Sequence, residues 1–276
     1  MEHNLHVHET AFITSTYRAT HPDLSKDPFA GLWNTPATDE WVAEHVIAVS
    51  EHEPHLHCLR NRYFFEQLQR LFAKQQISLL INFGSGFSMY PFSLPEGLRH
   101  IELDFPSILA YKKQHVDAWM SSGALPRRDI SYVGADFMAS DNHWVEELLS
   151  LKGHSKSFIL VEGVLFFLNP RDINAIFAIF DGIQQSGEYI GSVSFQETME
   201  GTPVFGRLLD FCTHRLNYPH GFHYQVVPDT FYRELPGYDC IDHQDGTTLN
   251  QQFSPDYPLP EHPGFLNENM YLLLKK

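Results

Sequence analysis

The stretch of residues 78–104 constrains the fold of this chain more than any other. Leu79–Phe83 is a short apolar run that breaks into Gly84-Ser85-Gly86, and a second apolar run ends further along at Asp104. An apolar run that stops at glycines predicts a buried strand followed by a tight turn, and the second run predicts the neighbouring strand. In doubly wound α/β sheets such a pair forms a nucleotide site, in which glycines let the backbone approach the ligand and the carboxylate binds the ribose hydroxyls. The alternative is an ordinary strand, turn and helix in which the glycines serve only the turn, and the acid at Asp104 weighs against it.

Strand and helix patterns alternate from this stretch towards the C-terminus. Apolar runs predict further strands at residues 130–137, 157–163, 189–196, 238–243 and 270–274, with helical patterns or loops between them. This alternation predicts one α/β sheet with crossover helices over residues 76–276. Residues 1–75 are predicted to form a helical cap that supplies one wall of the site. Because no linker or internal repeat separates the two parts, residues 1–276 are predicted to form a single domain.

Three segments have weaker local signals. A helix is predicted to start at Asp27-Pro28, because aspartate favours the N-cap and proline favours the first turn. Residues 51–57 are polar and are predicted to form a loop, ahead of a helix over Cys58–Ala73 whose apolar residues recur at helical spacing. Residues 245–263 are polar and rich in proline, and they are also predicted to form a loop.

Three successive predicted strands end in an acid. These acids are Asp104, Asp136 and Glu162. Ligands of open α/β sheets bind beyond the carboxyl ends of the strands, which is where these side chains are expected to lie. One such acid is easily an accident of helix capping, but three at the same edge favour a binding site. Arg60 and Arg62 lie early in the neighbouring predicted helix, where an arginine can bind a ligand carboxylate with two hydrogen bonds or simply face solvent.

Composition excludes several classes of partner. The chain has 276 residues with a formal net charge of −15, which argues against nucleic acid or an anionic membrane, because both need a basic face. It contains no apolar stretch long enough to span a membrane, and its first residues lack the pattern of a signal peptide. The 3 cysteines include no C-x-x-C pair, so a disulfide framework is not expected and a cytoplasmic location is predicted.

Histidine is unusually common, with 17 residues. A metal site needs three or four converging ligands, and His55 and His57 share one face only if their segment is extended. Histidines that face solvent or cap helices are the favoured interpretation, so no metal is predicted.

Four blocks of sequence resemble a known family. They are Thr10-Ala11 through Arg18 to Asp27-Pro28-Phe29-Ala30, Asn61-Arg62-Tyr63-Phe64, Ile81–Gly86 with Glu102–Pro106, and Gly134–Phe137 with Val161–Leu165 and Leu168-Asn169-Pro170. Together they resemble the leucine carboxyl methyltransferase family, which uses S-adenosylmethionine and includes O-methyltransferases of polyketide pathways. The chain departs from the family pattern at Ser88-Met89, where members often carry an acid and a threonine, and residues 197–265 do not align.

The resemblance implies a class I methyltransferase-like, Rossmann-like fold, with a seven-stranded sheet in which residues 270–274 supply the antiparallel strand. It implies that Arg62 pairs with the methionine carboxylate of S-adenosylmethionine, that Asp104 accepts both ribose hydroxyls and that Asp136 accepts the adenine amino group. Glu162 would face the amino group or the sulfonium side of the cofactor. The full set of cofactor-binding residues implied in this way is Arg62, Phe83, Gly84, Ser85, Asp104, Phe105, Asp136, Phe137 and Glu162.

The function expected from the resemblance is methyl transfer to an oxygen, a carboxylate or a hydroxyl, of a small molecule of polyketide type. The alternatives are methylation of a protein C-terminal carboxylate and a protein that binds S-adenosylmethionine without catalysis. A nicotinamide dehydrogenase is a weaker alternative, because the glycine turn lacks the third glycine of the dinucleotide fingerprint. A hydroxyl acceptor would benefit from a base, and His214, His220 and His223 are candidates, although surface histidines are the favoured interpretation for each of them. The sequence therefore indicates neither a catalytic base, nor the acceptor, nor the oligomeric state.

Overall fold

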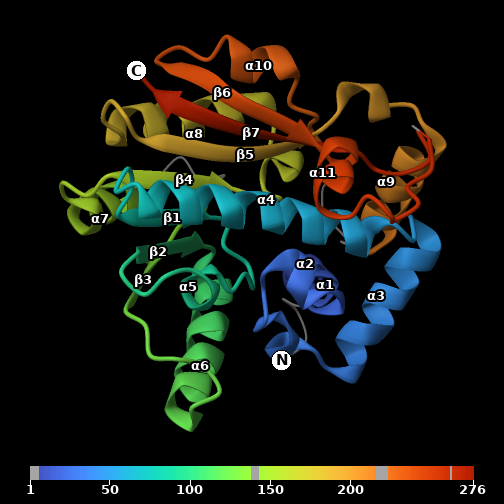
Figure 1. The fold of residues 1–276 in the computed structure, drawn as a ribbon, viewed down its shortest axis with the longest axis horizontal. Helices are drawn as coiled ribbons and strands as arrows, with labels where there is room; N and C mark the ends of the chain where they lie inside the picture. Colours follow the sequence, from blue (N-terminus) through green and yellow to red (C-terminus); the bar gives the residue numbers. More distant parts are fainter. Residues whose placement is uncertain (1–5, 138–142, 216–222, 262) are drawn as a thin grey trace.

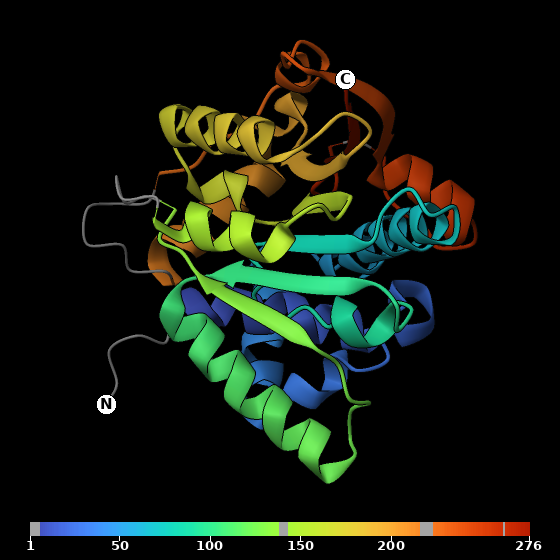
Figure 2. The ribbon, with the colours of Figure 1, turned by 90° about the vertical axis from the view of Figure 1, so that its left-hand side faces the viewer.

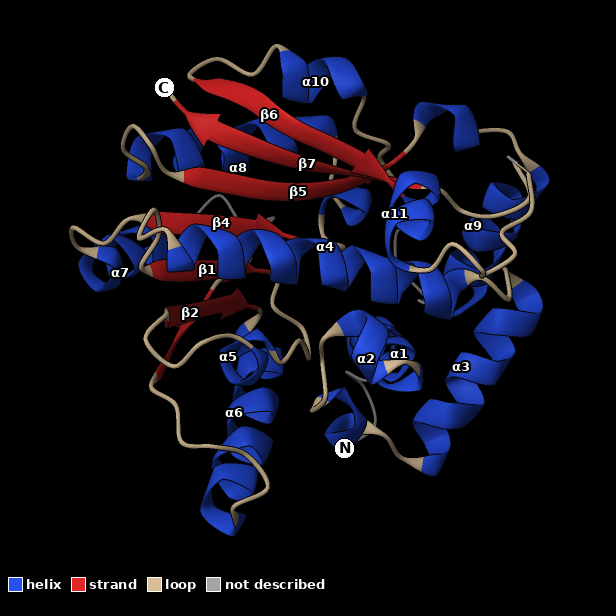
Figure 3. Ribbon diagram, viewed as in Figure 1, coloured by secondary structure: helices blue, strands red, loops and turns tan. Residues whose placement is uncertain are grey.

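One sheet organises the fold. In the computed structural model, which describes residues 6–137, 143–215, 223–261 and 263–276, seven strands form a sheet in the order β3-β2-β1-β4-β5-β7-β6 (Figures 1 and 3). Its parallel strands are β1 (Leu79–Phe83), β2 (Arg99–Asp104), β3 (Ile130–Gly134), β4 (Ser157–Val161) and β5 (Tyr189–Phe195). β7 (Glu268–Lys275) runs antiparallel between β5 and β6 (Tyr238–Asp245). This order confirms the predicted class I methyltransferase-like sheet with its antiparallel strand.

The central strands are buried on both faces. In β1, Leu79, Ile81 and Phe83 join the core on one face, and Leu80 joins the core on the other. Side chains of a strand alternate between the two faces, so a strand that is apolar at successive positions needs cover on both sides. The continuous apolar runs in the sequence therefore place β1 and β4 at the centre of the sheet.

Two sets of helices supply this cover (Figure 2). The first set packs on the face of Ile81 and comprises α7 (His143–Lys152), α8 (Pro170–Ile183) and α10 (Asp229–Arg233). The second set packs on the face of Leu80 and comprises α4 (Glu53–Ala73), α5 (Tyr90–Ser93) and α11 (Gly246–Phe253). A further helix, α6 (Pro106–Ser122), packs beside β2 and β3. No helix in the described part of the chain combines the length and the apolar character needed to cross a bilayer.

The N-terminal helices gather beside the carboxyl ends of the parallel strands. They are α1 (His6–Thr20), α2 (Pro22–Ser25), the short 3₁₀ segment η1 (Ala30–Trp33) and α3 (Pro36–Ala48). α1 packs against α3, α4 and η1, and α3 packs against α9 (Pro203–Arg215). In Figure 3 the arrowheads of β2 and β4 point to the side of the molecule where α1, α3 and α9 lie. Two further 3₁₀ segments, η2 (Leu165–Phe167) and η3 (Glu197–Met199), follow β4 and β5.

Two local predictions at the N-terminal side are wrong. Residues 51–57 were expected as a loop, but α4 begins at Glu53, because Pro54 occupies its first turn, where a proline needs no amide hydrogen. The helix expected from Asp27-Pro28 is only the short 3₁₀ segment η1, which begins three residues later at Ala30; α2 lies before it and ends at Ser25, with Lys26 as its C-cap at a positive φ of 59°. Asp27 instead accepts a hydrogen bond from Arg18.

The predicted loop over residues 245–263 is also wrong in its first part. Asp245 caps α11 by accepting a hydrogen bond from the Thr248 amide at 2.8 Å. Leu249 is fully buried against the sheet and holds this polar helix in place. With a single apolar anchor the segment has too weak a periodicity to be recognised as a helix.

Candidate functional site

A cavity of about 320 Å³ opens at the carboxyl ends of β1, β2 and β4. Its walls come from the glycine turn after β1, from the starts of the segments after β2 and β4, and from helices α1, α3, α4 and α9. One side is polar and is built around Asp104 and Arg18. The other side is lined with aromatic and aliphatic side chains, namely Phe166, Phe167, Phe195, Leu208 and Phe211. The position agrees with the rule that ligands bind beyond the carboxyl ends of the strands.

The glycine turn after β1 needs both of its glycines. Gly84 and Gly86 have positive φ angles of 70° and 44°. A Cβ at Gly84 would lie 2.0 Å from the Val164 side chain, so no other residue fits there without displacement. The amide groups of Gly84 and Ser85 donate to the Leu103 carbonyl at 2.8 and 3.0 Å, which ties the turn to β2. Ser85 is buried, and its hydroxyl has no hydrogen-bond partner among the described residues, although the residue lines the cavity.

Asp104 lies at the end of β2, as predicted, and is 5% exposed. Its Oδ2 accepts a hydrogen bond from the Gly86 amide and its Oδ1 accepts one from the Phe105 amide, both at 2.7 Å. Burial raises the pKa of Asp104, and these two amides act in the opposite direction by stabilising the charged form. Each carboxylate oxygen has a second lone pair, so Asp104 can still accept from a ligand.

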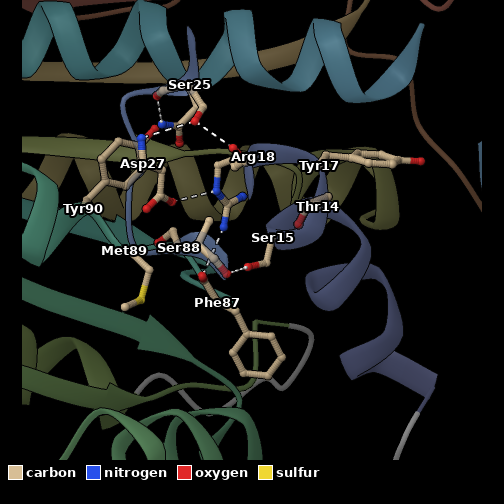
Figure 4. A network of polar contacts seen from close by, with 12 residues as sticks. Thr14, Ser15, Tyr17, Arg18, Ser25, Asp27, Phe87, Ser88, Met89 and Tyr90 are labelled. Carbon is tan, nitrogen blue, oxygen red and sulfur yellow. Dashed lines mark hydrogen bonds and ion pairs between the residues drawn. The ribbon is translucent and has the colours of Figure 1, made fainter. Parts of the chain in front are cut away.

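Arg18 is a cavity residue to which the sequence assigned no role (Figure 4). It is 4% exposed; its Nε donates to Asp27 at 3.0 Å, and its Nη2 donates to the Phe87 carbonyl at 3.1 Å. These two partners fix the guanidinium beside the glycine turn. Arg18 belongs to the first of the four blocks that carry the resemblance, which is the only signal that pointed to it.

Arg62 does not reach the cavity. Residues two apart on an α-helix project to nearly opposite sides, so Arg60 and Arg62 cannot both face the sheet edge. Arg62 forms an ion pair with Glu66 at 2.6 Å and lies 5.0 Å from the ring of Phe253. The assignment of Arg62 to the cofactor carboxylate is therefore corrected, and Arg18 and Arg60 are the arginines that line the cavity.

Arg60 connects the ends of β4 and β7. Its Nε donates to Glu162 at 2.8 Å, and its Nη1 donates to both carboxylate oxygens of Glu268 at 2.9 Å. Tyr90 donates its hydroxyl to the other oxygen of Glu162 at 3.1 Å. Glu162 thus lines the cavity as predicted, with both oxygens already engaged. Separating the partners of such a buried pair would leave an uncompensated charge, which is costly. These side chains are therefore expected to keep the arrangement described here.

The remaining predicted residues divide into two groups. Phe105 and Phe137 line the cavity, together with Gly84, Ser85, Asp104 and Glu162. Phe83 is fully buried, is not a lining residue, and stacks on Phe137 with ring centroids 4.0 Å apart. Asp136 follows β3 as expected, but it is exposed and is not among the lining residues.

A second polar cluster borders the apolar side of the cavity and was not predicted. It contains Glu53 and His57 from α4, Tyr17 from α1 and His45 from α3. The Tyr17 hydroxyl is hydrogen-bonded to Nδ1 of His45. Burial lowers the pKa of His45 to about 4, so this ring is neutral at pH 7. No short motif joins residues from three helices, which is why sequence reasoning missed the cluster.

The histidines singled out in the sequence lie elsewhere or outside the described residues. His214 is exposed and contacts the Asp210 carbonyl, His223 is also exposed, and His220 lies outside the described part of the chain. His55 and His57 are both on α4 and therefore point in different directions. Among the described residues no group of histidine, cysteine and acidic side chains is placed to hold a metal ion.

Comparisons with known proteins agree with this geometry. The sequence profile of the family described as leucine carboxyl methyltransferase matches residues 11–181. No curated protein gives a significant sequence match. Among solved structures, a proposed methyltransferase from Thermobifida fusca YX is similar at a TM-score of 0.62 and 15% identity, over 95% of this chain and 94% of that one. A DUF574 family protein from Streptomyces avermitilis MA-4680 is similar at a TM-score of 0.58 and 13% identity, over 87% of this chain and 91% of that one.

These structures share the fold at low identity, whereas the profile match spans more than half of the chain and covers the glycine turn, Asp104 and Glu162. The cavity at the carboxyl ends of the strands lies where that fold binds its ligand. The protein therefore belongs to the leucine carboxyl methyltransferase family, and it is a methyltransferase that uses S-adenosylmethionine.

Proposed function

We propose that this protein transfers the methyl group of S-adenosylmethionine to an oxygen, a hydroxyl or a carboxylate, of a small molecule of polyketide type. The observation that carries the proposal is the continuity of the cavity, which joins Asp104 and the glycine turn to a wall that includes Phe166, Phe195 and Phe211. Pockets that are mostly apolar with a few fixed polar groups are typical of sites for small molecules. An aromatic acceptor fits such a wall, because its rings replace water at the phenylalanine faces.

The residues of the polar side fit S-adenosylmethionine. Asp104 is proposed to accept the ribose hydroxyls with the lone pairs that Gly86 and Phe105 leave open. The buried, unpartnered hydroxyl of Ser85 is a ready partner for the methionine part, beside the backbone of the glycine turn. Arg18 is proposed to bind the methionine carboxylate in place of Arg62, since its guanidinium is held at the cavity wall.

Aromatic rings are proposed to hold the adenine. Phe105 and Phe137 line the cavity on the side of Asp104, and their ring centroids are 5.9 Å apart. Phe83 is proposed to act through Phe137, whose ring it supports by stacking. Hydrogen bonding of the adenine amino group by Asp136 stays a prediction. Glu162 is proposed to orient the sulfonium end of the cofactor through its fixed carboxylate.

Methyl transfer depends more on positioning than on acid or base groups. S-adenosylmethionine supplies a methyl group on a sulfonium, and the sulfur leaves as a neutral thioether. The network of Arg60, Glu162 and Glu268 is proposed to fix the sulfonium end of the cofactor so that its methyl group lies in line with the acceptor, because holding two reactants in register removes much of the entropic barrier. We also propose that residues 1–276 work as one methyltransferase domain, with residues 1–75 as the cap and 76–276 as the α/β core.

Methyl transfer from S-adenosylmethionine with an isotopically labelled methyl group tests this function. The protein is incubated with a panel of phenols, alcohols, carboxylic acids, amines and peptides with a free C-terminus, and the labelled products are identified by mass spectrometry and NMR. We expect the label on oxygen. Transfer only to nitrogen or carbon would contradict the proposal, and transfer only to a peptide C-terminus would favour the protein carboxyl methyltransferase alternative.

A further inference from the structure

The cluster on the apolar side of the cavity contains a histidine with a defined tautomer. His57 lines the cavity, and its Nδ1 lies 3.0 Å from the backbone carbonyl oxygen of Glu53, one helical turn earlier. A carbonyl oxygen only accepts, so Nδ1 must carry the hydrogen. In a neutral imidazole the other nitrogen, Nε2, is then an acceptor. No hydrogen bond to Nε2 is found among the described residues, so its lone pair is left for a ligand.

The side chain of Glu53 also lies beside the His57 ring. The residue is 4% exposed, and its Oε2 lies 3.7 Å from Nδ1 of His57. Its Oε1 is buried and has no hydrogen-bond partner among the described residues. The hydrogen bond from Nδ1 to the Glu53 carbonyl favours a positive charge on the ring, which is what a histidine needs if it takes up a proton at Nε2.

Burial, helped by nearby positive charges, keeps His57 neutral before reaction. Burial lowers the pKa of His57 well below its usual value, with further contributions from Arg60 on the same helix, His45 on α3 and Arg18 on α1. Burial and Glu268 on β7 raise the pKa of Glu53, and Arg60 acts against them. The basic form of His57 is therefore already present at pH 7.

We propose that His57 is the general base of the methyl transfer and that the acceptor group is a hydroxyl, with Glu53 as the positioning residue. This deepens the proposed function and rests on it. In the step, the hydroxyl oxygen bonds to the methyl carbon as the carbon–sulfur bond breaks and its electron pair stays on sulfur. The hydroxyl proton moves to Nε2 of His57, and Nδ1 keeps its hydrogen bond to Glu53. A carboxylate acceptor has no proton to lose at pH 7 and would need no such residue.

The other ionisable groups of the cavity are less suited to this role. Burial raises the pKa of Tyr17 well above its usual value, so its phenol stays protonated beside His45. His45 already uses Nδ1 for Tyr17. Glu162 is the ion-pair partner of Arg60 and accepts a hydrogen bond from Tyr90, so taking up a proton there would leave a buried guanidinium without its counter-charge.

Chemical modification tests the state of His57 without any acceptor. Diethyl pyrocarbonate attacks unprotonated imidazole, and N-acetylhistidine in the same solution serves as the reference. We expect mass spectrometry to show modification of His57 at a rate that changes less than twofold between pH 7.5 and 5.5, while the reference slows about tenfold as it protonates near pH 6.5. A His57 that stays unmodified, or slows with the reference, would overturn the assignment.

Turnover of His57→Gln tests the role. The acceptor panel is built from matched pairs such as 2-naphthol and 2-naphthoic acid, and His55→Gln is the control, because His55 lies on the same helix but outside the cavity, with Nε2 bonded to Asn250. For hydroxyl acceptors, we expect His57→Gln to lower kcat by about 100-fold or more and to remove the acid limb of the pH profile, with S-adenosylmethionine binding unchanged. His55→Gln should leave turnover within twofold.

The outcomes distinguish a failure of the general base from a failure of the proposed function. If the wild-type protein methylates hydroxyls and His57→Gln does so equally well, the general base is wrong and the proposed function stands. Methylation of carboxylates alone would also overturn the base while preserving O-methyl transfer. If no oxygen acceptor is methylated although S-adenosylmethionine binds, the proposed function fails, and the assignment of a base falls with it.

Discussion

Asp104 shows at the scale of one residue how a carboxylate is prepared for a ligand. Its two oxygens are held by the amides of Gly86 and Phe105, both at 2.7 Å, so the side chain has a fixed position before any ligand binds. A preorganised acceptor costs less ordering entropy on binding than a mobile one. The cofactor should therefore depend strongly on this single group.

Replacing Asp104 with asparagine should weaken S-adenosylmethionine binding about 10- to 100-fold. The ribose hydroxyls lose a charged acceptor, which corresponds to about 1.5–3 kcal/mol. Asp117→Asn is a matched control, because Asp117 is half-exposed on α6, outside the cavity, and pairs with Lys113. Calorimetry measures both variants, and an unchanged dissociation constant for Asp104→Asn would refute the ribose assignment.

Substitutions of Arg18 and Arg62 are expected to differ in their effect on recognition of the methionine carboxylate. Arg18→Lys keeps the charge beside Asp27 but loses the planar fork, so S-adenosylmethionine should bind about tenfold more weakly. Binding of 5′-methylthioadenosine, which lacks the carboxylate, should change less than twofold. Arg62→Lys should change neither ligand, since Arg62 is paired with Glu66 outside the cavity. Equal losses for both ligands in Arg18→Lys would show that Arg18 supports the cap and does not bind the carboxylate.

At the scale of elements, the turn after β1 holds the cofactor side of the cavity together. Gly84→Ala should destabilise the protein, because the residue has a φ of 70° and its new Cβ would lie 2.0 Å from Val164. Gly123→Ala has a similar φ of 81° with nothing within 4 Å of the new Cβ, so it measures the backbone cost alone. We expect about 1 kcal/mol for Gly123→Ala and about 1–3 kcal/mol more for Gly84→Ala.

Urea unfolding measures these costs. The addition of Val164→Ala should recover part of the stability lost in Gly84→Ala, because it removes the clashing methyl groups. Equal costs for the two glycine variants, or no recovery in the double variant, would show that Val164 is not the constraint.

The elements around β1, β2 and β4 were predictable because their sequences are locally unambiguous. Continuous apolar runs demand burial on both faces, and the glycines and terminal acids mark where each strand ends. α11 was missed because Leu249 is its main buried apolar residue, and the start of α4 was missed because its first residues are polar although Glu53 and His55 are buried. Burial of polar residues depends on partners from other elements, which local patterns do not contain.

The site was predictable only where it lies on those strands. Asp104 and Glu162 are at strand ends and were found, whereas Arg18, His57 and Tyr17 come from helices that meet only in three dimensions. To choose between Arg60 and Arg62, one must know which face of α4 is turned towards the sheet. A resemblance in sequence places such a motif on the helix without showing which of two neighbouring arginines faces inward.

At the scale of the whole molecule, buried histidines make stability depend on pH. Burial lowers the pKa of His45 to about 4 and that of His100 to about 3, whereas both return to about 6.5 on unfolding. At these two sites the unfolded chain then binds more protons, so their contribution to stability is full above about pH 6.5 and falls as the pH drops towards these values. Each histidine should cost about 1.4 kcal/mol between pH 7.5 and 5.5.

His100→Gln tests this dependence away from the cavity. Urea midpoints at pH 7.5 and 5.5 should differ less in this variant than in the wild type, by the share of one histidine. His154→Gln, at an exposed position, should leave the wild-type difference in place. If His100→Gln loses as much stability as the wild type on acidification, His100 is not protonated on unfolding in this range.

The central claim is that the cavity at the carboxyl ends of β1, β2 and β4 binds S-adenosylmethionine. Calorimetric titration of the full chain with S-adenosylmethionine and with S-adenosylhomocysteine tests it most directly. We predict binding of both at one site per chain, with dissociation constants in the micromolar range. Failure to bind either ligand, together with tight binding of a nicotinamide dinucleotide, would contradict this claim. The glycine turn would then be interpreted as part of the dinucleotide site of a dehydrogenase.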